Sequence, residues 1–232
     1  MLDLNALGAG YGKVRILRDV TCRIGKGDIV GIIGRNGVGK TTLMKTIIGL
    51  IKAGSGSIRY DGADVTRLNA TQRARRAIGY VPQGRGVFPQ LTVHENLRVG
   101  ELIGIVEHKR DYDLIYKYFP ILRERANQRA GTMSGGEQQQ LSIGRALVGR
   151  PKLLLLDEPS EGIQPSIVQQ IGENVAAIAA DTGLTVLFVE QNLDLITMLA
   201  KRCYVIDKGT IIDDINPDEL KNKDTVKRYL AV

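Results

Sequence analysis

A glycine-rich segment between a β-branched stretch and a helical pattern carries the residues best suited to hold phosphate. It reads Gly34-Arg35-Asn36-Gly37-Val38-Gly39-Lys40-Thr41. Its glycines let successive backbone N–H groups point inward, and a helix that begins near Lys40 adds partial positive charge. In such a loop Lys40 reaches the β- and γ-phosphates, and the Thr41 hydroxyl coordinates Mg²⁺. The segment predicts a site for Mg-ATP, which extends to Thr42.

Two adjacent carboxylates follow a continuous apolar run, Leu153–Leu156, which predicts a buried strand. Asp157, at the carboxyl end of that strand, is placed to coordinate magnesium at the edge of a parallel sheet. Glu158 is placed to polarise an attacking water as a general base. Two neighbouring carboxylates repel one another unless a cation lies close, so a metal ion also suits the pair. We therefore expect Glu158 and Lys40 to be catalytic.

A second segment suited to an anion, Met133-Ser134-Gly135-Gly136-Glu137, opens another predicted helix. Ser134 is a good N-cap, and the paired glycines expose backbone N–H groups at the helix start. This segment has no lysine or metal ligand of its own. The economical interpretation is that it closes over nucleotide held by another subunit.

The elements around these segments predict an α/β fold. Buried strands at Ile29–Ile33, Leu153–Leu156 and Thr185–Val189 alternate with helices, which favours a mainly parallel sheet. The N-terminal part predicts strands and tight turns, from Val14 to Ile24 and as a hairpin from Gly54 to Val65. The expected helices include one with Leu43, Ile47 and Leu50 on one face, Gly49 near its end, and another from Pro165 to Ala180. We expect one domain over residues 1–232, with a catalytic core (1–84 and 151–232) and an inserted helical subdomain (85–150).

Composition and charge narrow the classes of partner. The net charge is +7, but basic residues are spread along the chain, and the densest patch, Arg73-Ala74-Arg75-Arg76, is predicted to be a solvated face. A nucleic-acid partner is therefore not expected. No apolar run approaches the length of a membrane-spanning helix, and Met1–Asn5 lacks the features of a signal peptide. We expect a cytoplasmic protein that meets a membrane only through a partner.

The two cysteines and two histidines suggest no metal centre of their own. Cys22 and Cys203 lie far apart in apolar, strand-like contexts and are predicted to be small buried hydrophobic residues. The histidines, His94 and His108, do not belong to a ligand-like cluster, and His94 is predicted at the surface.

In order and spacing, these segments resemble the ATP-binding subunits of ABC transporters over essentially the whole chain. Ser134-Gly135-Gly136 resembles the signature motif of that family, which few other phosphate-loop ATPases carry. The resemblance implies a head-to-tail dimer that sandwiches two ATP molecules, each between one subunit's phosphate loop and the other's signature, with Mg²⁺ as the metal. It also implies that Tyr11 stacks on adenine. Gln83 resembles the Q-loop glutamine, which contacts Mg²⁺ and the water.

The sequence departs from the family pattern at three positions. The signature ends in Glu137 where the family usually has glutamine, and Gln164 replaces the usual aspartate of the D-loop. Gln191 occupies the switch-loop position where the family usually places histidine. Gln191 is therefore expected to be a third catalytic residue: it can donate an amide N–H to the γ-phosphate, but it cannot carry a proton or a positive charge. Because Glu158 is retained, we expect a slower but active site, and a heterodimer with a histidine-bearing partner.

The departures themselves resemble the second ATPase of importers for branched-chain amino acids, urea and short-chain amides. Within that group Tyr80–Arg85 and Glu161–Ser166 resemble the urea and amide branch more than the branched-chain branch. The resemblance implies transmembrane permease subunits and a periplasmic or extracellular solute-binding protein. It places the chain at the cytoplasmic face of the cell membrane, with Phe88–Leu97 forming part of a groove for a coupling helix of the permease.

Three alternatives remain open at this point. The solute of the importer is the first, since a branched-chain amino acid fits the same motifs. The second is an ABC ATPase that serves nucleic acid, although neither a long coiled-coil insertion nor a second cassette is present in the sequence. The third is an exporter ATPase or a non-hydrolysing nucleotide binder, and Glu158 argues against the non-hydrolysing form.

Overall fold

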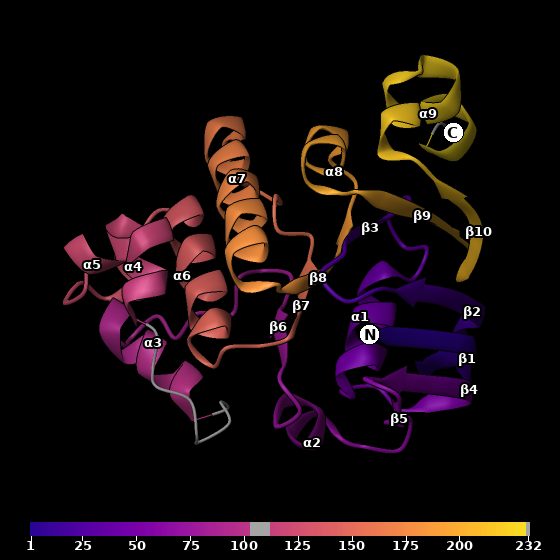
Figure 1. The fold of residues 1–232 in the computed structure, drawn as a ribbon, viewed down its shortest axis with the longest axis horizontal. Helices are drawn as coiled ribbons and strands as arrows, with labels where there is room; N and C mark the ends of the chain where they lie inside the picture. Colours follow the sequence, from indigo (N-terminus) through magenta and orange to yellow (C-terminus); the bar gives the residue numbers. More distant parts are fainter. Residues whose placement is uncertain (103–111, 231–232) are drawn as a thin grey trace.

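The computed structural model describes residues 1–102 and 112–230, which form two sheets flanked by helices (Figure 1). The first sheet is antiparallel, with strand order β2-β1-β4-β5, and it contains the predicted hairpin near residues 54–65. It supplies the N-terminal antiparallel part that the sequence predicts. Its strands are β1 (Leu2–Tyr11), β2 (Val14–Ile24), β4 (Ala53–Tyr60) and β5 (Ala63–Asp64).

The second sheet carries the predicted site residues, among them Asp157, at the edge where its parallel strands end. Its order is β10-β9-β3-β8-β7-β6, and every pairing is parallel except that of β10 with β9. Every residue of β3, β7 and β8 is buried, as expected for parallel strands covered on both faces. The three predicted buried strands are thus confirmed. The strands are β3 (Ile29–Ile33), β6 (Ile78–Val81), β7 (Leu153–Asp157), β8 (Thr185–Glu190), β9 (Arg202–Asp207) and β10 (Thr210–Ile215).

Successive side chains of the central strands point to opposite faces of the sheet and so belong to two separate hydrophobic cores. Val30 and Leu155 face the antiparallel sheet and helix α1 (Lys40–Ile48), whereas Ile33 and Leu156 face the opposite side. Helices α7 (Pro165–Thr182) and α8 (Leu193–Leu199) pack on that opposite side. The 3-10 helix η2 (Pro217–Lys221) and helix α9 (Lys223–Leu230) follow β10 near the C-terminus.

A group of helices follows β6, precedes β7, and lies to one side of the sheets in Figure 1. It comprises α3 (Val93–Glu101), α4 (Tyr112–Tyr118), α5 (Pro120–Glu124), the 3-10 helix η1 (Ala130–Thr132) and α6 (Gly135–Val148). Together with the sheets, this group confirms the predicted fold class. The domain limits at 85 and 150 remain a prediction.

Helix α1 ends two residues earlier than the apolar pattern indicates. Gly49 takes a left-handed conformation, with φ of 87°, and caps the helix by donating its N–H to Lys45 and Thr46. Gly49 is thus near the helix end as predicted. Leu50 lies beyond the cap and is 59% exposed, so the prediction that it faces inward is wrong.

The basic run after β5 does not form a solvated face throughout. Arg73, in helix α2 (Ala70–Ala74), is only 1% exposed, so that prediction is wrong for this residue. The last carbonyls of a helix lack N–H donors from a following turn, and the Arg73 guanidinium donates to two of them in α1, one of which, that of Thr46, also accepts from the Gly49 N–H. It donates to the carbonyl oxygens of Thr46, Ile47, Thr66 and Leu68 at 2.7–3.0 Å.

The cysteines are buried as predicted, and burial raises the pKa of both thiols, of Cys22 and of Cys203, to about 12. His94 is exposed as predicted, and His108 lies outside the described residues. In the ranges that the structure describes, no helix has the length and apolar character needed to cross a membrane.

Candidate nucleotide-binding site

The phosphate loop connects the buried strand β3 to helix α1. Gly37 and Gly39 have φ of 79° and 112°, conformations that side chains disfavour, so the loop shape depends on glycine at both positions. Lys40 is 3% exposed, and its ammonium donates to the carbonyl oxygens of Gly34 and Arg35 at 2.8 and 3.0 Å. The loop thus folds its own backbone around one buried positive charge, which suits a phosphate group.

Asp157 lies at the end of β7, beside the start of α1. The Thr41 hydroxyl donates to its Oδ1 and the Tyr80 hydroxyl to its Oδ2, both at 3.0 Å. Asp157 is fully buried, and burial raises its pKa, while these two hydrogen bonds act in the opposite direction. Oxygen donors from a hydroxyl and a carboxylate fit Mg²⁺, and two of the three residues predicted as ligands, Thr41 and Asp157, are in contact, whereas Gln83 contacts the neighbouring Glu158.

Tyr80 was not predicted as a site residue, and its contact with Asp157 leads to a test. Tyr80→Phe removes a donor to the carboxylate and so raises the pKa of Asp157 further. A larger fraction of Asp157 is then protonated, and a metal ion must displace that proton to bind. The affinity for Mg²⁺ should therefore fall about tenfold, and the loss should grow as the pH decreases. Titration with Mn²⁺ or Mg²⁺ in the presence of ATP measures this. Tyr60→Phe is the matched control, because the buried Tyr60 hydroxyl has no hydrogen-bond partner in the described structure.

Glu158 follows Asp157 in a left-handed conformation, with φ of 48°, which is uncommon for a residue with a side chain. Its Oε1 lies 3.0 Å from the Lys40 ammonium, and its Oε2 accepts from the Gln83 amide at 3.3 Å. The structure therefore brings the predicted base, the phosphate-loop lysine and the Q-loop glutamine together. Strain at such a position is common where a side chain must be aimed at a reactant.

The loops after β7 and β8 share one buried carboxylate that the sequence analysis did not single out. Glu190, 3% exposed, accepts from the backbone N–H groups of Ser160, Gln191 and Asn192 at 2.8–3.0 Å. The Gln191 side chain extends to the phosphate loop, where its amide donates to the Asn36 Oδ1 at 2.5 Å. The predicted switch residue thus lies beside the predicted phosphate site.

Because Gln191 is neutral, its replacement by histidine should raise the rate of hydrolysis. A charged donor is favoured over a neutral one by roughly 1 kcal/mol, which corresponds to about fivefold. The gain should be larger below about pH 6.5, where histidine is protonated, and smaller above it. A pH series of ATP turnover for Gln191→His checks this, with Gln170→His, on the exposed face of α7, as the control. Equal pH profiles for the two variants would contradict it.

The signature segment has the predicted helix cap. The Ser134 side chain accepts from the Glu137 N–H at 3.4 Å, and Glu137 accepts from the Ser134 N–H at 2.8 Å, which forms a capping box. Glu137 also pairs with Arg125 at 3.1 Å. Glutamate in place of glutamine therefore keeps the cap and adds an ion pair. Among the described residues, no hydrogen bond or ion pair joins Ser134, Gly135, Gly136 or Glu137 to the phosphate loop, and Figure 1 shows α6 well apart from α1.

Tyr11 lies at the end of β1 and is 51% exposed, so its ring is free to act as a stacking surface. Gln164, the residue that departs from the D-loop pattern, is the exposed N-cap of α7 and makes no side-chain cap.

Comparison with known proteins identifies the class. Residues 17–161 match the model of the ABC transporter family. The chain is 49% identical over 216 residues to BraG, a high-affinity branched-chain amino acid transport ATP-binding protein of Pseudomonas aeruginosa, with 91% of each chain covered. It is 34% identical to LptB, a lipopolysaccharide export system ATP-binding protein of Haemophilus influenzae, over 100% of this chain and 97% of LptB.

A solved structure agrees with this match. The ADP conformation of MJ1267, an ATP-binding cassette of an ABC transporter, superposes with a TM-score of 0.84 at 27% identity, over 100% of this chain and 99% of that one. The chain belongs to the ABC transporter family. It is an ATPase whose hydrolysis of ATP, with Mg²⁺ as the metal, is coupled to transport, as the sequence predicts.

Proposed function

We propose that this chain is the ATPase subunit of an importer for branched-chain amino acids. The observation that carries the proposal is the 49% identity with BraG across 91% of both chains. Urea or a short-chain amide is the second candidate solute, and it rests on the segments Tyr80–Arg85 and Glu161–Ser166 alone. The chain would act at the cytoplasmic face of the membrane, with permease subunits and a solute-binding protein as partners.

The site supports hydrolysis by a pair of subunits. In one subunit the phosphate loop and Lys40 would hold the phosphates, and Thr41, Asp157 and Gln83 would hold Mg²⁺, which would supply positive charge to the phosphates. Glu158 accepts the proton of the attacking water. The signature segment is separate from this loop, so it would contribute its N–H groups to nucleotide held by a partner. We propose a heterodimer with a partner that carries histidine at the switch position.

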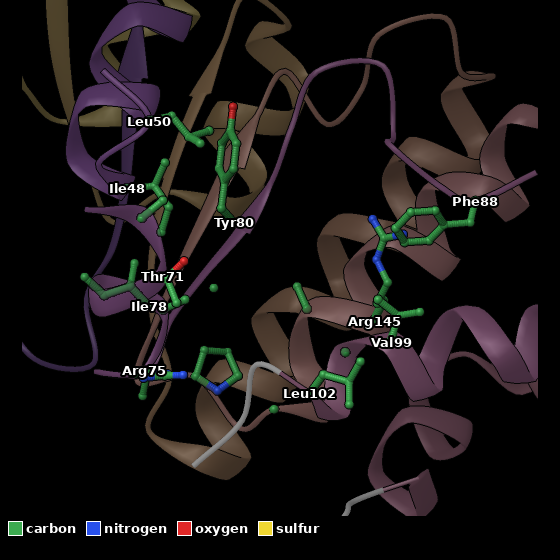
Figure 2. Close-up of a pocket in the computed structure, with 18 residues that line it drawn as sticks. Ile48, Leu50, Thr71, Arg75, Ile78, Tyr80, Phe88, Val99, Leu102 and Arg145 are labelled. Carbon is green, nitrogen blue, oxygen red and sulfur yellow. The ribbon is translucent and has the colours of Figure 1, made fainter. Parts of the chain in front are cut away.

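A groove lies between the core and the helical group, and it would receive a coupling helix of the permease. Figure 2 shows this cavity of about 440 Å³ between the end of α1 and α2 on one side and α3 and α6 on the other. Leu50, Leu102 and Phe88 line it and are 59%, 84% and 45% exposed. Of the predicted segment 88–97 only Phe88 lines the cavity, and the buried Asn96 holds its backbone through two hydrogen bonds. Exposed apolar residues in a groove suit an amphipathic helix of a partner.

Uptake by the assembled transporter tests the proposal. The chain is reconstituted in vesicles with its permease subunits, partner ATPase and solute-binding protein, and ATP-dependent uptake of labelled leucine, urea and acetamide is compared. Leucine uptake that requires ATP is the expected result. Uptake of urea or acetamide alone would favour the second candidate, and outward movement of a lipid substrate would contradict import.

A further inference from the structure

A three-residue loop next to the Q-loop glutamine is unusual in its backbone. Gly84, Arg85 and Gly86 have φ of 78°, 71° and 61°, so three left-handed residues follow one another and the middle one has a long side chain. Arginine is rarely found in this conformation, because its Cβ crowds the backbone there. Such a conformation persists only where the surrounding structure fixes it, and it is frequent at functional sites.

Helix α6 fixes this loop along one face. Gly135 and Ser142 lie seven residues apart and Arg145 three further, a spacing that places them on the same side of a helix. The Ser142 hydroxyl donates to the Arg85 carbonyl, and the Arg145 guanidinium donates to the Gly86 carbonyl at 2.7 Å. The loop is therefore bound to the helix that begins with the signature segment.

The Arg85 side chain bridges two segments that must act together. A Cβ added at Gly135 would lie 2.7 Å from the Arg85 Nη2, so the guanidinium lies directly against the signature glycine. The same Nη2 donates to the carbonyl oxygen of Gly162 at 3.3 Å. Gly162 directly follows the turn that begins at Glu158, which the Glu161 N–H closes by donating to the Glu158 carbonyl at 3.2 Å, and lies in the overlapping turn that the Ile163 N–H closes onto the Ser160 carbonyl at 3.2 Å. Arg85 thus connects the start of α6 to the turn that follows the predicted base.

The charge of Arg85 argues against a purely structural role. The N-terminus of a helix carries partial positive charge, so an acidic side chain stabilises it and a guanidinium does not. In the described ranges Arg85 forms no ion pair with a carboxylate, and Glu137, the acid of this helix end, pairs with Arg125 instead. Helix capping therefore does not explain a cation at this position.

We propose that Arg85 is a positioning residue for ATP hydrolysis, which holds the signature segment in register with the turn that follows Glu158. The inference rests on the proposed composite site, in which the signature of one subunit and the Glu158 of its partner act on one ATP molecule. Gln83, two residues earlier, contacts Glu158 itself. A displacement of the loop on nucleotide binding would therefore reach Glu158 and the signature together, through Gln83 and Arg85.

The test separates turnover from nucleotide binding. In the full-length chain with its partner ATPase, Arg85→Ala should lower kcat about 10- to 100-fold, the loss expected when reacting groups are misplaced by about 1 Å. The KM for ATP and the equilibrium affinity for a fluorescent ATP analogue should change less than about threefold, because the phosphate loop is untouched. Arg85→Lys keeps one donor for the Gly162 carbonyl and should recover part of kcat.

The controls keep the outcome decisive. Arg59→Ala, on the exposed face of β4, should leave kcat and KM unchanged. If Arg85→Ala lowers the melting temperature, Arg85→Lys decides, because it retains the charge and the side-chain length. Wild-type turnover in Arg85→Ala, or an equal change in kcat and ATP affinity, overturns the inference. Absence of ATP turnover in the wild-type pair would instead contradict the composite site on which it rests.

Discussion

Replacing Glu158 by glutamine in this subunit should lower ATP turnover at its site about 10²- to 10⁴-fold, the usual contribution of a positioned general base. Glutamine has nearly the same shape but cannot take a proton. The affinity for ATP should not fall, because the carboxylate that now lies 3.0 Å from Lys40 is removed and the ammonium stays available for phosphate. Single-turnover hydrolysis and equilibrium binding of ATP, measured on the dimer with the substitution in this chain alone, give the two quantities.

Glu173→Gln is the matched control for that substitution. Glu173 lies on the exposed face of α7, where its carboxylate accepts from Gln169 at 2.9 Å. The same change of charge at this position should leave turnover within about twofold of wild type. Unchanged turnover in Glu158→Gln would mean that this site does not hydrolyse ATP and that the partner's site accounts for all of the measured turnover.

Arg73→Met should destabilise the protein more than any other single arginine substitution in the run from 73 to 76. Methionine fills most of the volume but removes the donor from four carbonyl groups, of which the two at the end of α1 are buried and the other two partly buried. Each lost hydrogen bond of this kind costs about 1 kcal/mol or more, so we expect a loss of about 4 kcal/mol in the free energy of unfolding. For a chain of this size the melting temperature should fall by about 10 °C.

Urea denaturation and thermal unfolding measure this loss. Arg76→Met is the control, because Arg76 is exposed and its replacement should change stability by less than about 0.5 kcal/mol. Equal urea midpoints and melting temperatures for the two variants would show that the Arg73 guanidinium does not stabilise the end of the phosphate-loop helix α1.

The parts of the site that were predictable depend on contacts between neighbours in sequence. The phosphate loop, the strand before it and the N-cap at Ser134 are each specified by a few consecutive residues, and the structure has them as predicted. The roles of Gln83 and Gln191 toward nucleotide remain predictions, although both side chains lie at the site.

The missed contacts join residues far apart in the chain. Tyr80 and Asp157 are separated by 77 positions and meet because β6 pairs with β7 in parallel. A tyrosine in a short, partly buried strand gives no sign of this until the strand order is known. Arg73 appeared solvated because its neighbours Arg75 and Arg76 are charged as well, and its partners Thr46 and Ile47 precede it by 27 and 26 positions.

The Glu190 carboxylate has a consequence for the dynamics of the site. It accepts from the N–H of Ser160 in the loop after β7 and from those of Gln191 and Asn192 in the loop after β8, so one buried carboxylate connects the two loops, and each loop that opens gives up its own hydrogen bonds to it. Groups linked in this way open as one cooperative unit. The amide protons of the two loops should therefore exchange with solvent at a common rate. The loop that follows Asp157 and Glu158 and the loop that carries Gln191 would then open and close together.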